Sequence, residues 1–166
     1  MTATASKDPA SKPTFDRTNS AGLWHFAHQY RQAGEVIREK NALAVVTYYL
    51  FCHSIELALK AYLRGSGHTI QQLINLRHDL EKTLAAAEKL RINQVFPISD
   101  DLRVAVQTMN VYYSKKDFEY IFAGYQRLIK LDVLSRVASE LVSGLKAYCM
   151  QHQHLHDGRP TAHTCG

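Results

Sequence analysis

Residues 42–63 read ALAVVTYYLFCHSIELALKAYL, and this stretch decides the fold. Apolar residues fall on almost every side of the helix that it predicts, so we expect a helix that is buried nearly all round and that the other helices pack against. The helix is expected to run from Asn41 to Gly65. Its longest run without a charge or a histidine ends at Cys52, and a bilayer span needs about 20 such residues. The stretch therefore predicts a central core helix and not a membrane span.

Three polar residues interrupt this helix on one face. His53, Glu56 and Lys60 follow one another at i, i+3 and i+7. Glu56 and Lys60 form an i,i+4 pair in the favourable order, which is worth about 0.2–0.5 kcal/mol and requires no function. A lysine at the edge of a buried helix also projects its charge into a groove while its stem stays packed. A structural stripe is the simpler interpretation, and a functional one stays open.

The helix before this stretch is predicted from its apolar period. Asn19 or Ser20 is suited to cap it. The apolar residues that are expected to face the core are Leu23, Phe26, Tyr30, Ala33 and Ile37. A short connection near Asn41 makes the two helices an antiparallel hairpin. The small residues of the central helix that would let another helix approach closely are Ser54, Ala58 and Ala61.

Three more helices are expected after Gly65. Thr69 and Gln72 form a capping-box pattern that starts the first of them, which continues to Leu90 with a break near residues 75–78. Asp79 is suited to cap the restarted helix, and His78 is then expected to point at the polar stripe. Ser99 caps the next helix, whose inner residues are expected to be Leu102, Ala105, Met109 and Tyr112. Asp132 is expected to cap the last helix, whose inner residues are Leu134, Ala138, Leu141, Leu145 and Tyr148.

The helical period is lost between residues 114 and 131, where an irregular crossing is expected. Phe118, Tyr120 and Phe122 are spaced two apart. The neighbouring basic residues are Lys115, Lys116 and Arg127. Basic residues interleaved with aromatic ones are suited to hold phosphates and to stack on bases. The alternative is that the rings only fix the crossing to the bundle, and the two interpretations have equal weight.

Length and composition indicate one domain. The 166 residues suffice for a single hydrophobic core, and we expect a bundle over 19–152 between disordered tails at 1–18 and 153–166. The N-terminal tail lacks the apolar core of a signal peptide. Three scattered cysteines are typical of a reducing compartment, so a cytoplasmic protein without membrane contact is expected. The net charge of +5 is not concentrated on one helix, which leaves weak polyanion binding and an ordinary basic surface equally open.

Three segments of the chain together resemble HEPN domains, the helical "higher eukaryotes and prokaryotes nucleotide-binding" family. They are residues 54–63, which read SIELALKAYL; His78-Asp79-Leu80 after a short glycine-containing turn; and Asp117-Phe118-Glu119-Tyr120 before the final helix. The resemblance covers about residues 22–150 in order. It implies an up-and-down helical bundle, usually a homodimer, with roles in nucleotide or RNA binding, in toxin–antitoxin pairs and in defence systems.

Many members of that family are metal-independent ribonucleases that carry an Arg followed after four to six residues by a His near the start of the last helix. The arginines at the corresponding place are Arg127 and Arg136, but the next histidine is His152, so the motif is absent. The sequence also contains no phosphate-binding glycine loop and none of the common hydrolase signatures. We therefore expect no catalytic residues, no cofactor and no metal, and the interpretation leans against an enzyme.

The prediction from sequence is thus an all-α, HEPN-like bundle of about five helices that binds a nucleotide or an RNA phosphate without catalysis. The residues expected to contact the ligand are Lys60, His78, Lys115, Lys116, Tyr120 and Arg127, supported by Glu56 and Asp79. One alternative is a ribonuclease with an atypical site, such as His78 with Lys115 or Lys116. Another is a purely structural partner of a second protein, encoded nearby.

Overall fold

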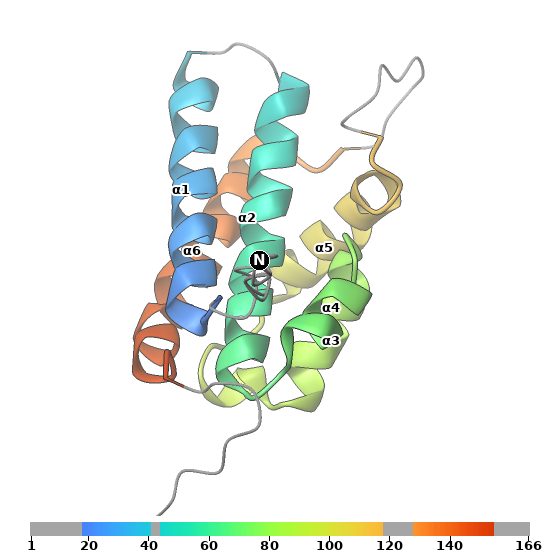
Figure 1. Ribbon diagram of the computed structural model, residues 1–166. Helices are drawn as coiled ribbons and strands as arrows, with labels where there is room; N and C mark the ends of the chain where they lie inside the picture. Colours follow the sequence, from blue (N-terminus) through green and yellow to red (C-terminus); the bar gives the residue numbers. More distant parts are fainter. Residues whose placement is uncertain (1–17, 41–43, 118–127, 155–166) are drawn as a thin grey trace, which may run out of the picture.

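The computed structural model describes residues 18–40, 44–117 and 128–154, and this part of the chain is a helical bundle (Figure 1). The elements are α1 (Ser20–Glu39), α2 (Ala44–Gly65), α3 (Ile70–Asn75), α4 (Leu80–Lys89), the 3-10 turn η2 (Ile92–Gln94), α5 (Asp100–Tyr113) and α6 (Leu131–Gln151). The all-α prediction is confirmed. The tails expected to be disordered lie almost wholly outside the described residues.

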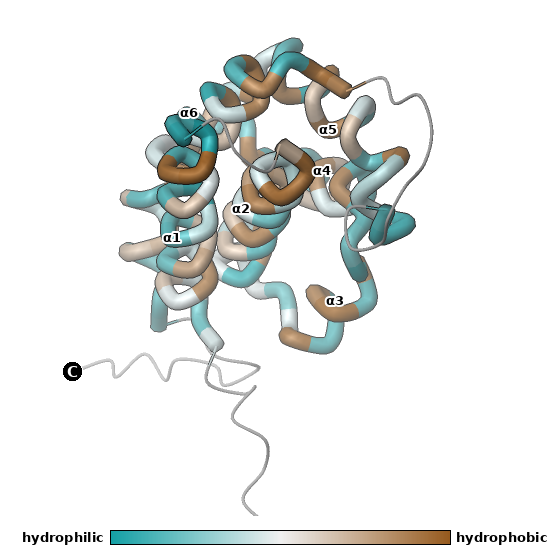
Figure 2. The backbone as a smooth tube through the Cα atoms, turned by 90° about the horizontal axis from the view of Figure 1, so that it is seen from above, coloured by the Kyte–Doolittle hydropathy of each residue, from teal (hydrophilic) through white to brown (hydrophobic). Residues whose placement is uncertain are grey.

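Helix α2 is the centre of the bundle, as its sequence predicts. It contacts α1, α3, α4, α5 and α6, and Figure 2 shows it with α1, α6, α5 and α4 around it. Side chains on every side of α2 are buried, among them Phe51, Cys52, Ile55, Leu59 and Leu63. None of the helices in the described part of the chain is long and apolar enough to cross a membrane.

The small-residue face of α2 packs against α1. Ser54 Oγ donates a hydrogen bond of 2.8 Å to the carbonyl of Ala27, and Ser20 Oγ donates one of 2.8 Å to the carbonyl of Ala61. These side-chain bonds to the backbone of the facing helix require a close approach, which small residues permit. The expectation of a closely approaching helix is confirmed. Since α1 covers this face, it is not available as the surface of a dimer.

The predicted inner face of α1 is wrong, because the helix is rotated about its axis and buries a different set of residues. Phe26 is 53% exposed and Ala33 is also exposed. The residues that are buried are Ser20, Trp24, Ala27 and Gly34. The close contact with α2 selects small side chains for the interface, whereas the sequence analysis selected large apolar ones. Trp24 joins α1 to α6, because its Nε1 donates a 2.7 Å hydrogen bond to the carbonyl of Val142.

The expected break in the third helix is present and divides it into α3 and α4. The capping box of Thr69 and Gln72 begins α3, and the Asp79 side chain caps α4 by accepting from the amide of Lys82. Arg77, between the helices, has a φ of 53°, in the left-handed region that is costly for a residue with a Cβ. This turn redirects the chain so that His78 faces α2.

Two details of the later helices correct the sequence analysis. Ser99 caps α5 as expected, but Tyr113 is buried and Tyr112 is only half-buried, so the inner face ends one residue later. Helix α6 begins at Leu131 without a side-chain cap. Asp132, the expected cap, lies in its first turn and forms a 2.8 Å ion pair with Arg38 of α1.

Candidate functional site

A buried carboxylate on α2 is the centre of the candidate site. Glu56 is 1% exposed. Its Oε1 accepts a hydrogen bond of 2.5 Å from Lys60 Nζ, and its Oε2 accepts one of 2.5 Å from the hydroxyl of Tyr113. Lys60 Nζ also donates to the carbonyl of Arg77 at 2.7 Å. The ammonium therefore joins α2 to the turn before α4, and Glu56 is bonded on both oxygens.

The contacts of His53 assign its tautomer. The Tyr113 hydroxyl has one hydrogen, which it donates to Glu56, so the 2.7 Å contact between Tyr113 and His53 requires Nδ1–H of His53 as the donor. The His53 ring is stacked on Tyr49 at 5.6 Å between centroids and meets Tyr30 edge-on at 4.4 Å. These contacts hold the imidazole in place, one turn before Glu56.

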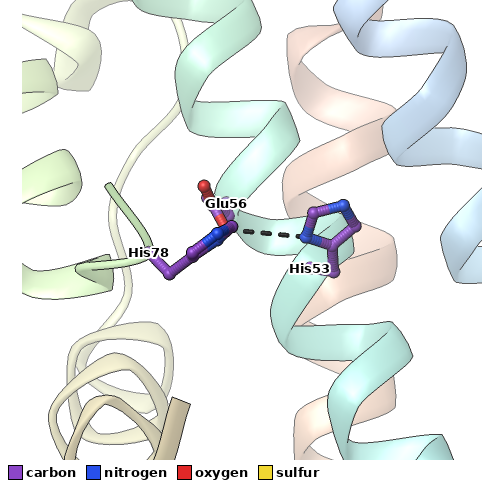
Figure 3. A group of neighbouring side chains, drawn as sticks. All are labelled: His53, Glu56 and His78. Atoms are coloured by element: carbon purple, nitrogen blue, oxygen red, sulfur yellow. Dashed lines mark hydrogen bonds and ion pairs between the residues drawn. The ribbon is translucent and has the colours of Figure 1, made fainter. Parts of the chain in front are cut away.

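His78 completes the cluster from the other side. Its Nδ1–H donates a 3.0 Å hydrogen bond to Glu56 Oε2. Figure 3 shows His53 and Glu56 on α2 and His78 on the segment before α4, all directed towards one another. The His78 side chain is 40% exposed, against 2% for Glu56. The Nδ1 side of the His78 ring is thus bonded to a carboxylate, while another part of the ring is exposed to solvent.

The electrostatics follow from this arrangement. Burial raises the pKa of the Glu56 carboxyl, but the nearby Nδ1–H of His53, at 3.5 Å and shared with Tyr113, the hydrogen bond from His78 and the charge of Lys60 outweigh burial and hold the pKa far below its usual value. The hydrogen bond to Glu56 raises the pKa of His78, against an opposing effect of burial. Burial, followed by the charge of Glu56, raises the pKa of Tyr113 strongly. Glu56 is therefore an anion that Lys60 neutralises, and Tyr113 is a neutral donor.

A pocket of about 340 Å³ opens beside the cluster. Its walls come from the start of α1, from α2, from α3 and from the turn before α4. The apolar residues that line it are Leu23, Phe26, Leu57, Ile70, Leu73 and Ile74, and the polar ones are Thr18, His53, Glu56, Lys60 and His78. A largely apolar pocket of this size with polar groups at one end is typical of a small-molecule site.

The structure brings together only some of the residues that the sequence analysis selected. Lys60, His78 and Glu56 lie in the cluster. Lys116 is exposed in the turn after α5, near enough for its charge to act on His78, and Lys115 is exposed beside it.

Three other selected residues are not part of the described cluster. Asp79 caps α4 and pairs with Lys82, away from Glu56. Asp79 thus has a structural role, and its expected support of a ligand stays a prediction. Tyr120 and Arg127 lie outside the described residues.

Sequence reasoning missed part of the site. His53 was placed on the polar stripe but not among the binding residues. Tyr113 was assigned only to the end of a helical pattern, and nothing in its local sequence marks it as a partner of Glu56, which lies 57 residues away. The pocket wall was missed because Phe26 was expected in the core. Two signals were available in the sequence: the polar stripe on an otherwise buried helix, and the break before Asp79, from which His78 is expected to point at that stripe, as it does.

The arrangement offers two kinds of chemistry. A carboxylate that holds Nδ1–H of a histidine orients that histidine as a proton acceptor at Nε2. The side-chain ligand atoms of His53, Glu56 and His78 also lie within 4.8 Å of one another, which is close enough for one metal ion.

The fold and the site define a class of protein: an all-helical bundle with a carboxylate–imidazole cluster at the end of an apolar pocket. Comparison of the chain with protein-family models, with curated proteins and with solved structures gave no match.

Proposed function

We propose that this chain is an HEPN-like, non-catalytic module that binds a nucleotide, free or at an exposed position of an RNA strand. The observation that carries the proposal is the pocket itself, which has apolar walls and ends at the exposed edge of His78. A base is suited to the apolar part, and a phosphate to the imidazole.

The charges near the pocket favour an anion. Glu56 does not repel a phosphate, because Lys60 is bonded to it at 2.5 Å. The Lys116 charge acts on His78 and lowers the pKa of the imidazole slightly against the hydrogen bond to Glu56, so a second cation lies in the neighbourhood of the ring. Lys60 is only 12% exposed and is bonded to Glu56 and to Arg77. Its role in this proposal is to neutralise Glu56, and His78 with Lys116 makes the contact with phosphate.

Binding of nucleoside monophosphates and of short fluorescent single-stranded RNAs tests the proposal. Ile74 lines the pocket and is 53% exposed, and Val104 on α5 is 52% exposed and does not line it. Ile74→Asp places a carboxylate on the wall and should weaken binding at least tenfold, whereas Val104→Asp should leave it within about twofold. His78→Ala should weaken binding, with the exposed His25→Ala as its control. Equal effects of the paired variants, or no binding by the wild type, would contradict the proposal.

A second candidate function is a ribonuclease that uses His78 as a general base. The hydrogen bond from His78 Nδ1 to Glu56 supports it, because a carboxylate in that position orients a catalytic imidazole. Nε2 would take the proton of the 2′-hydroxyl, whose oxygen bonds to phosphorus as the bond to the 5′-oxygen breaks. The leaving 5′-oxygen would take a proton from solvent, and Lys116 would stabilise the charge on phosphate. Incubation of labelled RNA with the wild type and with His78→Ala distinguishes the two functions: cleavage by the wild type alone favours the enzyme.

We further propose that the protein acts as a cytoplasmic homodimer in a toxin–antitoxin or defence-type system, as the resemblance implies. The dimer surface must lie elsewhere than on Ser54, Ala58 and Ala61, which α1 covers. Light scattering at micromolar concentration tests the assembly, and a monomer at that concentration would exclude it.

A further inference from the structure

We propose that His53, Glu56 and His78 form a binding site for one divalent transition-metal ion of the zinc class. Zinc bonds of about 2.0–2.2 Å in a tetrahedral arrangement place neighbouring ligand atoms about 3.3–3.6 Å apart. Glu56 Oε2 lies 3.0 Å from Nδ1 of His78 and 3.5 Å from Nδ1 of His53. The two imidazole nitrogens are at most 4.8 Å apart. Rotation of the two imidazoles, which brings their nitrogens closer together, would reach zinc geometry.

The three ligands are already held in place by the fold. His53 and Glu56 are one turn apart on the central helix, and Tyr30 and Tyr49 pack on the His53 ring. Lys60 holds the outer oxygen of Glu56, which leaves Oε2 directed at the imidazoles. Hydrogen bonds of this kind to the outer atoms of a ligand are the usual support of a metal site.

Metal binding requires the imidazole hydrogens to move, and it needs no further reactant to take them. A metal takes the lone pair at Nδ1, so the hydrogen that now sits there must move. Each neutral imidazole changes to the Nε2–H tautomer, and a protonated His78 releases one proton to solvent. Tyr113 moves away from Nδ1 of His53 and keeps its hydrogen bond to Glu56.

The donor set selects the class of metal. Two imidazole nitrogens and one carboxylate oxygen suit Zn²⁺, Co²⁺ or Ni²⁺, whereas Mg²⁺ and Ca²⁺ prefer oxygen ligands. Three protein ligands leave a fourth position, and all three residues line the pocket, so that position is open to a molecule entering from solvent. Open three-ligand sites of this composition are typical of catalytic and not of structural zinc. The proposal holds whichever ligand occupies the pocket.

Calorimetric titration with zinc chloride tests the site, provided that the clustered histidines and the cysteine near the C-terminus, which also offer metal ligands, are replaced first. The reference protein is the untagged full chain with His154→Ala, His156→Ala, His163→Ala and Cys165→Ser, treated with chelator and dialysed. We expect about one equivalent of Zn²⁺ at micromolar affinity or tighter, and no comparable binding of Mg²⁺. Co²⁺ should give the visible absorption of a four-coordinate ion.

The variants assign the site. His53→Ala and His78→Ala should each weaken Zn²⁺ binding at least tenfold in the reference protein, and the cobalt absorption should disappear. The control is His25→Ala with His28→Ala, a pair on α1, which should change neither. Circular dichroism checks that each variant is folded, and His53→Ala alone decides the question if the others unfold. No zinc binding by the reference protein, or equal affinity in His53→Ala, would overturn the proposal.

Discussion

Glu56 keeps its charge in a nearly closed environment because four neighbours surround it with donors and positive charge. Removal of one partner from a buried, hydrogen-bonded charge usually costs about 3–5 kcal/mol, since the remaining charge is left without compensation. The side chains around Glu56 therefore contribute to the stability of the fold, in addition to the binding that we propose for them. This is why variants of His53, His78 and Tyr113 need a folding control wherever their binding is measured.

The first prediction concerns pH and His78. The hydrogen bond to Glu56 raises the pKa of His78 in the folded state. A raised folded pKa contributes stability that is complete below the unfolded value of about 6.5 and is lost as pH rises through the folded value. His78→Gln should therefore reduce the free energy of unfolding more at pH 5.5 than at pH 8.5. Urea denaturation of both proteins at the two pH values measures the difference.

The contribution of Glu56 to stability depends on pH in the opposite direction, but it does not change over the range of this experiment. Its folded pKa is depressed, so its contribution is present above the unfolded value of about 4.3 and is lost as pH falls. Between pH 5.5 and 8.5 Glu56 stays ionised in both states, and it does not alter the comparison. An equal loss of stability in His78→Gln at both pH values would show that the histidine is held by packing alone.

At the scale of the element, α1 depends on a glycine that the sequence analysis did not select. A Cβ added to Gly34 would lie 2.8 Å from the ring of Phe51, which is fully buried. A Cβ on Gly22 would lie 3.4 Å from its nearest neighbour, Asn19 Oδ1. Alanine is the better helix former by about 1 kcal/mol, but overpacking costs about 1–3 kcal/mol.

Gly34→Ala should therefore lower the free energy of unfolding by up to about 2 kcal/mol, whereas Gly22→Ala should leave it unchanged or raise it slightly. Thermal and urea denaturation of the two variants give the comparison. Stabilisation by Gly34→Ala would mean that α1 and α2 do not approach as closely as the structure shows.

The same helix explains what the sequence could and could not predict. Helix α2 was predicted because it is apolar all round, and Asp79 and Ser99 were predicted as caps because capping is local chemistry. The inner face of α1 depends on how closely it packs, and a hydrophobic count does not register Ala27 or Gly34. The partnership of Glu56 with Tyr113 depends on the path of the chain between them. Local patterns therefore predicted the helices and the approach of His78 to the polar stripe, whereas the position of Tyr113 and the pocket wall depended on the fold.

The end of α4 gives a second prediction at this scale. Arg91, directly after the last residues of α4, has a φ of 63° and is exposed. Helices commonly end with glycine in this conformation, because glycine has no Cβ to strain. Arg91→Gly should raise the free energy of unfolding by up to about 1 kcal/mol. Lys89→Gly, within the last turn of α4, should lower it by about 1 kcal/mol, so the two substitutions should differ in sign.

At the scale of the whole molecule, the proposed binding of RNA depends on positive charge at the turn after α5. The chain has a net charge of +5, but much of the charge on the bundle is paired, as in Arg38 with Glu35 and Arg136 with Asp101. Lys115 and Lys116 are exposed, and the Lys116 charge acts on His78 at the pocket. Two explanations of RNA binding therefore differ in what they predict for lysine variants. One is a general attraction of a basic protein for RNA, and the other is a local interaction at this turn.

The last prediction separates these two effects by comparing two double variants that each remove two lysine charges. If Lys115 and Lys116 bind phosphates of a single-stranded RNA, Lys115→Ala with Lys116→Ala should reduce the slope of log affinity against log salt by about 0.7 for each phosphate that is no longer neutralised. Lys40→Ala with Lys89→Ala removes the same charge from exposed positions on other parts of the bundle, and it should change the slope much less. Fluorescence anisotropy of a labelled RNA over a salt series measures both. Equal slopes in the two double variants would mean that net charge alone attracts the RNA.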